Sequence, residues 1–202
     1  MAGEHVIGID LGTTNSCVAT VIDGAVHVIP DESGLRIQAS MVSFLQDGSV
    51  VVGNEARQEQ MVDPGNTVYS AKRLIGRHFA SKEVKTALQN FPFKLVKGKN
   101  NVPLVEIRSE RYGLPEISGM VLRRMKDIAE RYLRGPAPRA VVTVPANFND
   151  TQRQRVVNIT CLLRQRPRYG QVTSLRPAPC PSPRPAAARN RNRGRRGRRA
   201  PG

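Results

Sequence analysis

Apolar and polar residues alternate at the start of the chain, a pattern that predicts an antiparallel meander. Three short runs are rich in β-branched residues, and the first of them alternates: 6–10, 17–22 and 25–29. Asp23-Gly24 separates the second run from the third, and this dipeptide is typical of a two-residue hairpin turn. A second hairpin is predicted where residues 41–45 and 50–52 flank another Asp-Gly pair, Asp47-Gly48.

A different period, of three to four residues, predicts one long helix at 116–133 that packs against a sheet. Its apolar positions are Ile117, Val121, Met125, Ile128 and Tyr132. The Gly-Pro-rich segment 135–138 ends this helix. Two short helices are also predicted, at 54–62 with Asn54 as the cap and at 69–75, which Gly76 ends.

Residues 140–144, Ala-Val-Val-Thr-Val, are mostly apolar and rich in β-branched side chains, which predicts a buried strand that Pro145 terminates. Asn149, with Gln152 three positions later, resembles a capping box that begins another helix. The succession of strands and helices predicts an α/β fold over residues 1–154.

Charge divides the chain of 202 residues into two parts. All 16 acidic residues precede Arg155, whereas 13 of the 32 basic residues lie from Arg155 onward. The net charge of +16 therefore belongs mainly to the tail, and it does not make residues 1–154 a nucleic-acid-binding domain. From Arg166 onward, seven prolines and an Arg-Gly-rich end predict a disordered basic tail.

Two interpretations of the tail, residues 155–202, stay open. Its many Arg, Pro and Ala residues, without Lys, Asp or Glu, are typical of an out-of-frame reading of a GC-rich gene or a degenerate segment. The alternative is an Arg-rich arm at 189–199 that binds nucleic acid by neutralising phosphates. Tyr169 is the tail's one aromatic residue, so base stacking has little support.

The cysteines and the N-terminus predict a cytoplasmic protein with no membrane association. Cys17, Cys161 and Cys180 form no C-x-x-C pair, which argues against a disulfide framework or a zinc site. No signal-peptide pattern precedes the first strand, and no apolar run is long enough to span a membrane.

The segment Ile7-Gly8-Ile9-Asp10-Leu11-Gly12-Thr13-Thr14-Asn15-Ser16-Cys17 carries the most specific chemistry. A strand delivers Asp10 into a small, hydroxyl-rich turn whose N–H groups and threonine hydroxyls could cradle phosphate, while the carboxylate holds Mg²⁺ through its waters. The G-x-x-x-x-G-K-S/T spacing of a Walker A loop is absent. A tight hairpin without ligand remains the alternative on residue chemistry alone.

Three segments in order resemble motifs of the heat-shock protein 70 (DnaK-like) chaperone family. Residues 7–18 resemble its first phosphate-binding motif, 69–77 its lysine-bearing segment, and 142–154 its next signature. The resemblance covers residues 4–154 and implies an actin-like ATPase fold built from ribonuclease-H-like subdomains. On this basis residues 1–154 are interpreted as the N-terminal lobe of an incomplete nucleotide-binding domain.

The resemblance also implies roles for individual residues. Gly12, Thr13, Thr14 and Asn15 would bind ATP or ADP, and Asp10 would hold Mg²⁺ through water and serve catalysis. Lys72 would be the catalytic ammonium near the γ-phosphate, where it could stabilise charge in phosphoryl transfer. Pro145 and Arg153 would couple the nucleotide state to a peptide-binding domain.

Departures from the family limit what the resemblance implies. Ala39 stands where the family has proline, and Asn147 where it has tyrosine. After Gln154 the likeness ends, so the family's second phosphate loop, adenosine pocket and peptide-binding domain have no counterpart in the sequence.

The function implied is that of a stress-response chaperone for ATP-dependent protein folding, serving unfolded clients with a J-domain co-chaperone and a nucleotide exchange factor. We expect a truncated form without full activity, and the sequence leaves open whether it hydrolyses ATP. The alternatives are an inactive fragment or a tail that binds nucleic acid.

Overall fold

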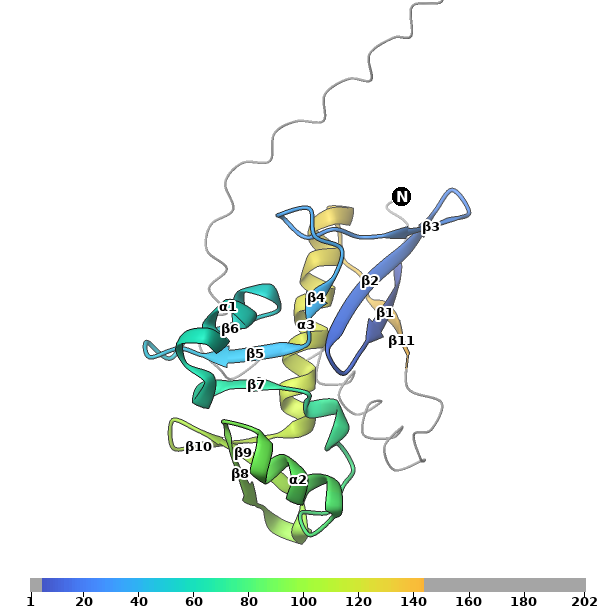
Figure 1. Ribbon diagram of the computed structural model, residues 1–202. Coiled ribbons are helices and arrows are strands. Elements are labelled where there is room, and N and C mark those ends of the chain that lie inside the picture. The colour runs from blue at the N-terminus through green and yellow to red at the C-terminus, as the bar shows by residue number, and fades with distance from the viewer. Residues whose placement is uncertain (1–4, 144–202) are drawn as a thin grey trace, which may run out of the picture.

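The structure is a computed structural model that describes residues 5–143, a mixed α/β arrangement of three sheets around one long helix (Figure 1). Pro145, Arg153, the helix predicted from Asn149 and the whole of the predicted tail lie outside the described residues. No helix within residues 5–143 is long and apolar enough to cross a membrane.

The first sheet is the meander that the alternation predicted, with one strand added from far along the chain. Its strands are β1 (Val6–Leu11), β2 (Asn15–Ile22), β3 (Ala25–Val28), β4 (Gln38–Ala39) and β11 (Arg139–Val142). The order is β11-β1-β2-β3, with β4 paired to β2, and β11 runs parallel to β1 while the other pairs are antiparallel. Asp23 and Gly24 both have positive φ, 51° and 77°, which confirms the predicted hairpin turn.

Helix α3 (Leu114–Leu133) packs against β1 and β2 and also reaches strands of the other two sheets. Ile117, Val121, Met125 and Ile128 are each at most 3% exposed, so the predicted apolar stripe is confirmed. Tyr132 is 46% exposed, and its assignment to the core was wrong because Leu133, its neighbour, is the residue of the last turn that packs against the core. Arg134 ends the helix with a left-handed φ of 52°, just before the predicted Gly-Pro segment.

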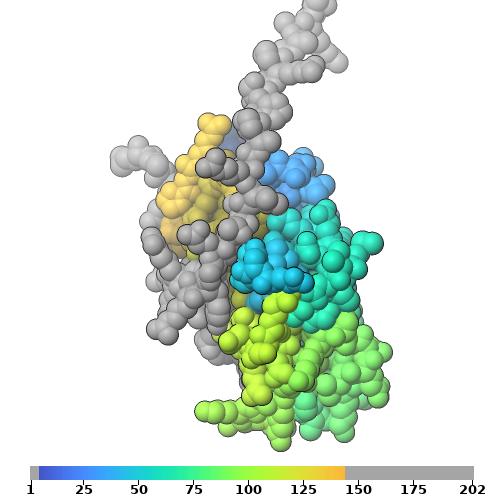
Figure 2. Space-filling view, turned by 90° about the vertical axis from the view of Figure 1, so that its left-hand side faces the viewer, coloured from blue at the N-terminus to red at the C-terminus, as the bar shows by residue number. Residues whose placement is uncertain are grey.

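The second and third sheets form the rest of the described body. The second has the order β6-β5-β7 and the third β10-β9-β8, all antiparallel. Their strands are β5 (Met41–Phe44), β6 (Val50–Val52), β7 (Thr67–Tyr69), β8 (Lys94–Lys97), β9 (Pro103–Ile107) and β10 (Glu110–Gly113). The helices beside them are α1 (Asn54–Val62), η1 (Pro64–Asn66), η2 (Ala71–Arg73), α2 (Lys82–Asn90) and η3 (Lys99–Asn101). The space-filling view shows the third sheet, in green, at the opposite end from the last turn of α3, with the second sheet's residues, in cyan and teal, between them (Figure 2).

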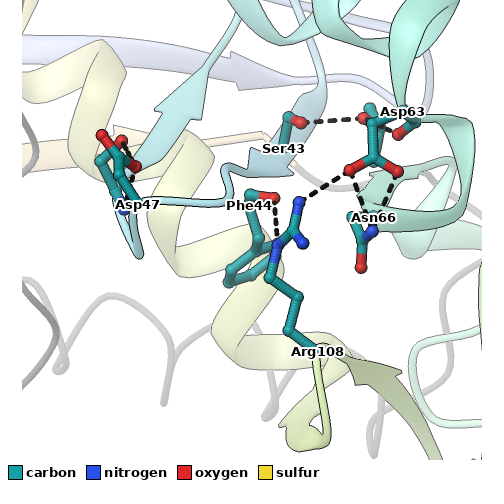
Figure 3. A network of polar contacts seen from close by, with 8 residues as sticks. Ser43, Phe44, Asp47, Asp63, Asn66 and Arg108 are labelled. Atoms are coloured by element: carbon teal, nitrogen blue, oxygen red, sulfur yellow. Dashed lines mark hydrogen bonds and ion pairs between the residues drawn. The ribbon is translucent and has the colours of Figure 1, made fainter.

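One arginine ties these two sheets together (Figure 3). Arg108, in the β9–β10 turn, donates from Nε to the Phe44 carbonyl at 3.0 Å and from Nη2 to Asp63 Oδ2 at 2.7 Å. Asn66 donates to both oxygens of the same carboxylate. The aromatic rings of Phe44 in β5 and Tyr112 in β10 also pack across the two sheets, with their centroids 4.5 Å apart.

Three predicted details differ from the structure. Residues 69–75 do not form a helix: Tyr69 ends β7, where it pairs with Met41, and only the short turn η2 follows. Asn54 does not cap α1; Gly53 holds that position with φ 91°. The strand predicted to be buried is exposed, with Val141 at 65%, because β11 is the outermost strand of the described sheet.

Candidate phosphate-binding site

The turn that joins β1 to β2 closes unusually tightly. Leu11 and Ser16 are paired across the two strands, so only residues 12–15 make the connection. A Cβ atom added to Gly12 would lie 2.0 Å from the backbone oxygen of Asn15, far inside contact distance. Only glycine therefore permits this turn, and the requirement is steric rather than a matter of φ.

Ser40, which lies between β4 and β5, holds the back of the turn. Its amide donates to the Thr14 carbonyl at 2.8 Å, and its hydroxyl donates to the Gly12 carbonyl at 2.9 Å. The hydroxyl is also 2.8 Å from that of Ser16, which is 2% exposed. Two of the four turn residues, Gly12 and Thr14, are thus hydrogen-bonded to Ser40.

Lys72 approaches the same turn from η2. The chain enters η2 through Ser70, whose φ of 54° is unusual for a residue with a side chain. Lys72 is only 6% exposed, and its ammonium donates to the Leu11 carbonyl. Burial lowers the pKa of Lys72, and the nearby negative charge of Asp10 opposes that change.

Asp10 stands at the exposed end of β1, next to the turn. Thr143 donates from Oγ1 to Asp10 Oδ1 at 2.6 Å, and its amide donates to the Ile9 carbonyl at 3.0 Å. On the other side, Asp10 is paired with Cys17 across β1 and β2. Burial, assisted by the charge of Asp10, raises the pKa of the Cys17 thiol.

A second cation reaches the turn from α1. Arg57 Nη2 donates to Asn15 Oδ1 at 2.9 Å, across 42 positions of sequence. The bond orients the carboxamide of Asn15 and brings a guanidinium beside the exposed residues of the turn.

The site therefore combines two cations and one carboxylate around a turn of small residues. The described residues contain no group of three His, Cys, Asp or Glu side chains that could hold a metal ion by themselves. One carboxylate fits Mg²⁺ in a nucleotide complex, since that ion keeps several waters and takes its other ligands from phosphate oxygens. Lys72 and Arg57 supply the positive charge that a polyphosphate requires.

The structure brings together the residues that the sequence predicted within the described part. Asp10, Lys72 and the turn residues Gly12, Thr13, Thr14 and Asn15 lie around one point, whereas Pro145 and Arg153 lie outside the described residues.

Three residues of this site were not predicted: Ser40, Arg57 and Thr143. Each reaches the turn or Asp10 over at least 26 positions of sequence, so no local pattern identifies them. Thr143 alone had a sequence signal, because it lies in the predicted strand at 140–144. A parallel partner of β1 would carry it to the end of β1 where Asp10 stands.

Comparison with protein families gives one match over most of the chain. A family model described as Hsp70 protein matches residues 6–162. The matched range includes every described element and extends beyond Gln154, where the motif likeness had ended.

Proposed function

The chain belongs to the Hsp70 protein family, and from this membership we propose that its β1–β2 turn binds the phosphates of Mg-ATP and Mg-ADP. Proteins of this family are molecular chaperones that bind these nucleotides with Mg²⁺. The described strands and α3 would then be the first lobe of an actin-like ATPase domain.

The observation that carries this proposal is the burial of Lys72 at the turn. A lysine that is 6% exposed is rare unless its charge is paired, and its ammonium contacts Leu11 beside the carboxylate of Asp10. A surface lysine without function would not need this costly position. The arrangement favours an ammonium group that is positioned to bind an anion at the turn.

Each residue has a definite part in the proposed site. The backbone N–H groups of residues 12–15 and the hydroxyls of Thr13 and Thr14 would donate to phosphate oxygens. Lys72 would stabilise charge that develops on the transferred phosphoryl group. Asp10, oriented by Thr143, would accept hydrogen bonds from metal-bound water. Bound Mg²⁺ would neutralise phosphate charge.

The wider function is proposed on family membership alone. The chain would act in the cytoplasm in ATP-dependent folding, serving unfolded client proteins together with a J-domain co-chaperone and a nucleotide exchange factor. Pro145 and Arg153 would couple nucleotide state to client binding. The second candidate function is a protein that binds ATP without hydrolysing it. Measurements of ATP turnover distinguish this function from that of an ATPase.

The test is phosphate release from Mg-ATP by the full chain and two lysine variants. Lys72→Met keeps the apolar stem but removes the ammonium, and Lys85→Met changes an exposed lysine of α2 as the matched control. If the chain turns over ATP, Lys72→Met should slow release by about 10²–10³-fold, whereas Lys85→Met should leave it unchanged. Equal rates for all three proteins would contradict the role of Lys72. Absence of turnover in the unaltered chain would leave nucleotide binding as the remaining proposal.

A further inference from the structure

We propose that Ser40 is a positioning residue of the phosphate turn, which draws two carbonyl groups away from the bound anion. The inference rests on the proposed function, because it concerns how the same turn recognises phosphate. It assigns a role to a residue that touches neither the nucleotide nor the metal in the site described above.

The two bonds made by Ser40 fix two peptide planes of the turn. The Gly12 carbonyl accepts from Ser40 Oγ, and the Thr14 carbonyl accepts from the Ser40 amide. In a trans peptide the C=O and the following N–H point in opposite directions. The N–H groups of Thr13 and Asn15 therefore point away from Ser40.

This orientation decides what the turn can bind. A carbonyl oxygen that faced the ligand would repel phosphate, whereas successive N–H groups attract it. A short turn of Gly and Thr residues can rotate its peptide planes easily, so an external anchor is needed to keep them in the binding arrangement. Ser40 provides two such anchors from one residue.

The hydroxyl of Ser40 is itself oriented by Ser16. The two side-chain oxygens are 2.8 Å apart, and either could donate from distance alone. Because Ser40 has one hydroxyl proton and gives it to Gly12, the proton between the two serines must come from Ser16. The resulting chain runs from Ser16 to Ser40 to Gly12, and each bond polarises the next. Ser16 is buried, which protects the chain from competing water.

The experiment measures the binding of Mg-pyrophosphate to the full chain by calorimetry, at an ionic strength near physiological. Pyrophosphate isolates the phosphate contacts, and the salt suppresses neutralisation of the arginine-rich tail. Ser40→Ala removes the hydroxyl bond, and Ser40→Thr restores a hydroxyl. Ser43→Ala is the matched control, because Ser43 is buried in β5 and its hydroxyl bonds to Thr67 rather than to the turn.

We expect Ser40→Ala to weaken pyrophosphate binding about five- to tenfold, because the variant loses the hydrogen bond that orients the Gly12 carbonyl. Ser40→Thr should bind within about twofold of the unaltered chain, and Ser43→Ala should bind equally well even if its melting temperature falls. Backbone ¹⁵N relaxation measured by NMR without ligand should show greater mobility of the residue 13 amide in Ser40→Ala only, because the Gly12 carbonyl loses its anchor while the Ser40 amide still holds Thr14.

Three results would overturn the inference, and they differ from failure of the proposed function. Undiminished binding by Ser40→Ala would remove the role of Ser40 while the turn remained a phosphate site. Equal weakening in Ser43→Ala would reduce Ser40 to general stability. Failure of the unaltered chain to bind pyrophosphate at all would refute the proposed function and this inference with it.

Discussion

Replacing Gly12 with alanine is the sharpest perturbation of the turn. The added Cβ would stand 2.0 Å from the Asn15 oxygen and 3.2 Å from its carbonyl carbon. Real Cβ atoms essentially never come within 3.0 Å of another atom, so the two groups must separate by about 1 Å. The atom in the way is backbone at the start of β2, which pairs with β4, and it cannot swing aside as a side chain could.

The loss of stability in Gly12→Ala can be worked out from the contacts that the added methyl group would break. Opening the turn by this amount would break one or both bonds from Ser40, at about 1 kcal/mol each, and add about 1–3 kcal/mol of strain. We therefore expect Gly12→Ala to lower the free energy of unfolding by about 2–5 kcal/mol. Gly8, in the strand that leads into the turn, offers a matched control because a Cβ there meets nothing within 4 Å. Gly8→Ala should gain about 0.5–1 kcal/mol through lower chain entropy.

Urea unfolding of both full-length variants, followed by circular dichroism, measures the difference. With a slope of about 2 kcal/mol per molar urea, the two midpoints should differ by about 1–3 M. Midpoints that coincide would show that the turn adapts freely. In that case the steric argument, and with it the claim that only glycine closes this turn, would be wrong.

Three further predictions concern Cys17, Arg108 and Glu106. The raised pKa of Cys17 leaves little thiolate at pH 8, so iodoacetamide should modify Cys17 more slowly than it modifies an unstructured peptide thiol. Asp10→Asn removes the negative charge that helps to raise this pKa and should speed the reaction. Peptide-resolved mass spectrometry measures both rates. Arg108→Ala removes the ion pair to Asp63 and the carbonyl bond between two sheets, and should cost about 1–2 kcal/mol in urea unfolding, whereas no change would deny that this link matters. Hydrogen bonds from lysine and arginine neighbours lower the pKa of Glu106, so the stability that its carboxylate contributes is present above the ordinary pKa of 4.5 and is lost as pH falls through the lowered pKa. Glu106→Gln should therefore flatten the fall in unfolding free energy at acid pH, and an unchanged pH profile of stability would contradict this prediction.

Local residue chemistry predicted the parts of the fold that local chemistry determines. Asp23-Gly24 adopts the paired positive φ of a two-residue hairpin, and Gly76, at φ 77°, occupies the left-handed position that was expected of it. The bounds predicted for the helix at 54–62 match α1, and α3 begins two residues before its predicted start. These features depend on residues within a few positions of one another.

Segments whose structure depends on distant partners were predicted poorly. Tyr69 reads as helical beside Ala71 and Lys72, yet pairing with Met41 in the second sheet makes it a strand residue. Helix α2 was missed although Ser81 caps it and Val84 and Ala87 are buried at helical spacing. Strands β8, β9 and β10 were also missed, because their short runs are interrupted by charged residues and turns.

The same division applies to the site. Asp10 and the turn that follows it form one continuous motif, for which residue chemistry alone left a phosphate cradle and a hairpin without ligand as alternatives. Lys72 entered only through family resemblance, and its burial against Leu11 became visible only in the structure. Ser40 and Arg57 contribute bonds that no spacing rule contains, since the fold alone brings them to the turn.

Calorimetric titration of Mg-ATP into the full chain, near physiological ionic strength, tests the central claim most directly. Gly8→Ala and Gly12→Ala are titrated in parallel at a temperature where both are folded. The account predicts saturable binding that requires Mg²⁺, persists in Gly8→Ala and is lost or greatly weakened in Gly12→Ala. Heat that is equal in all three proteins, or that disappears as salt is raised, would mean that the β1–β2 turn is not the phosphate site.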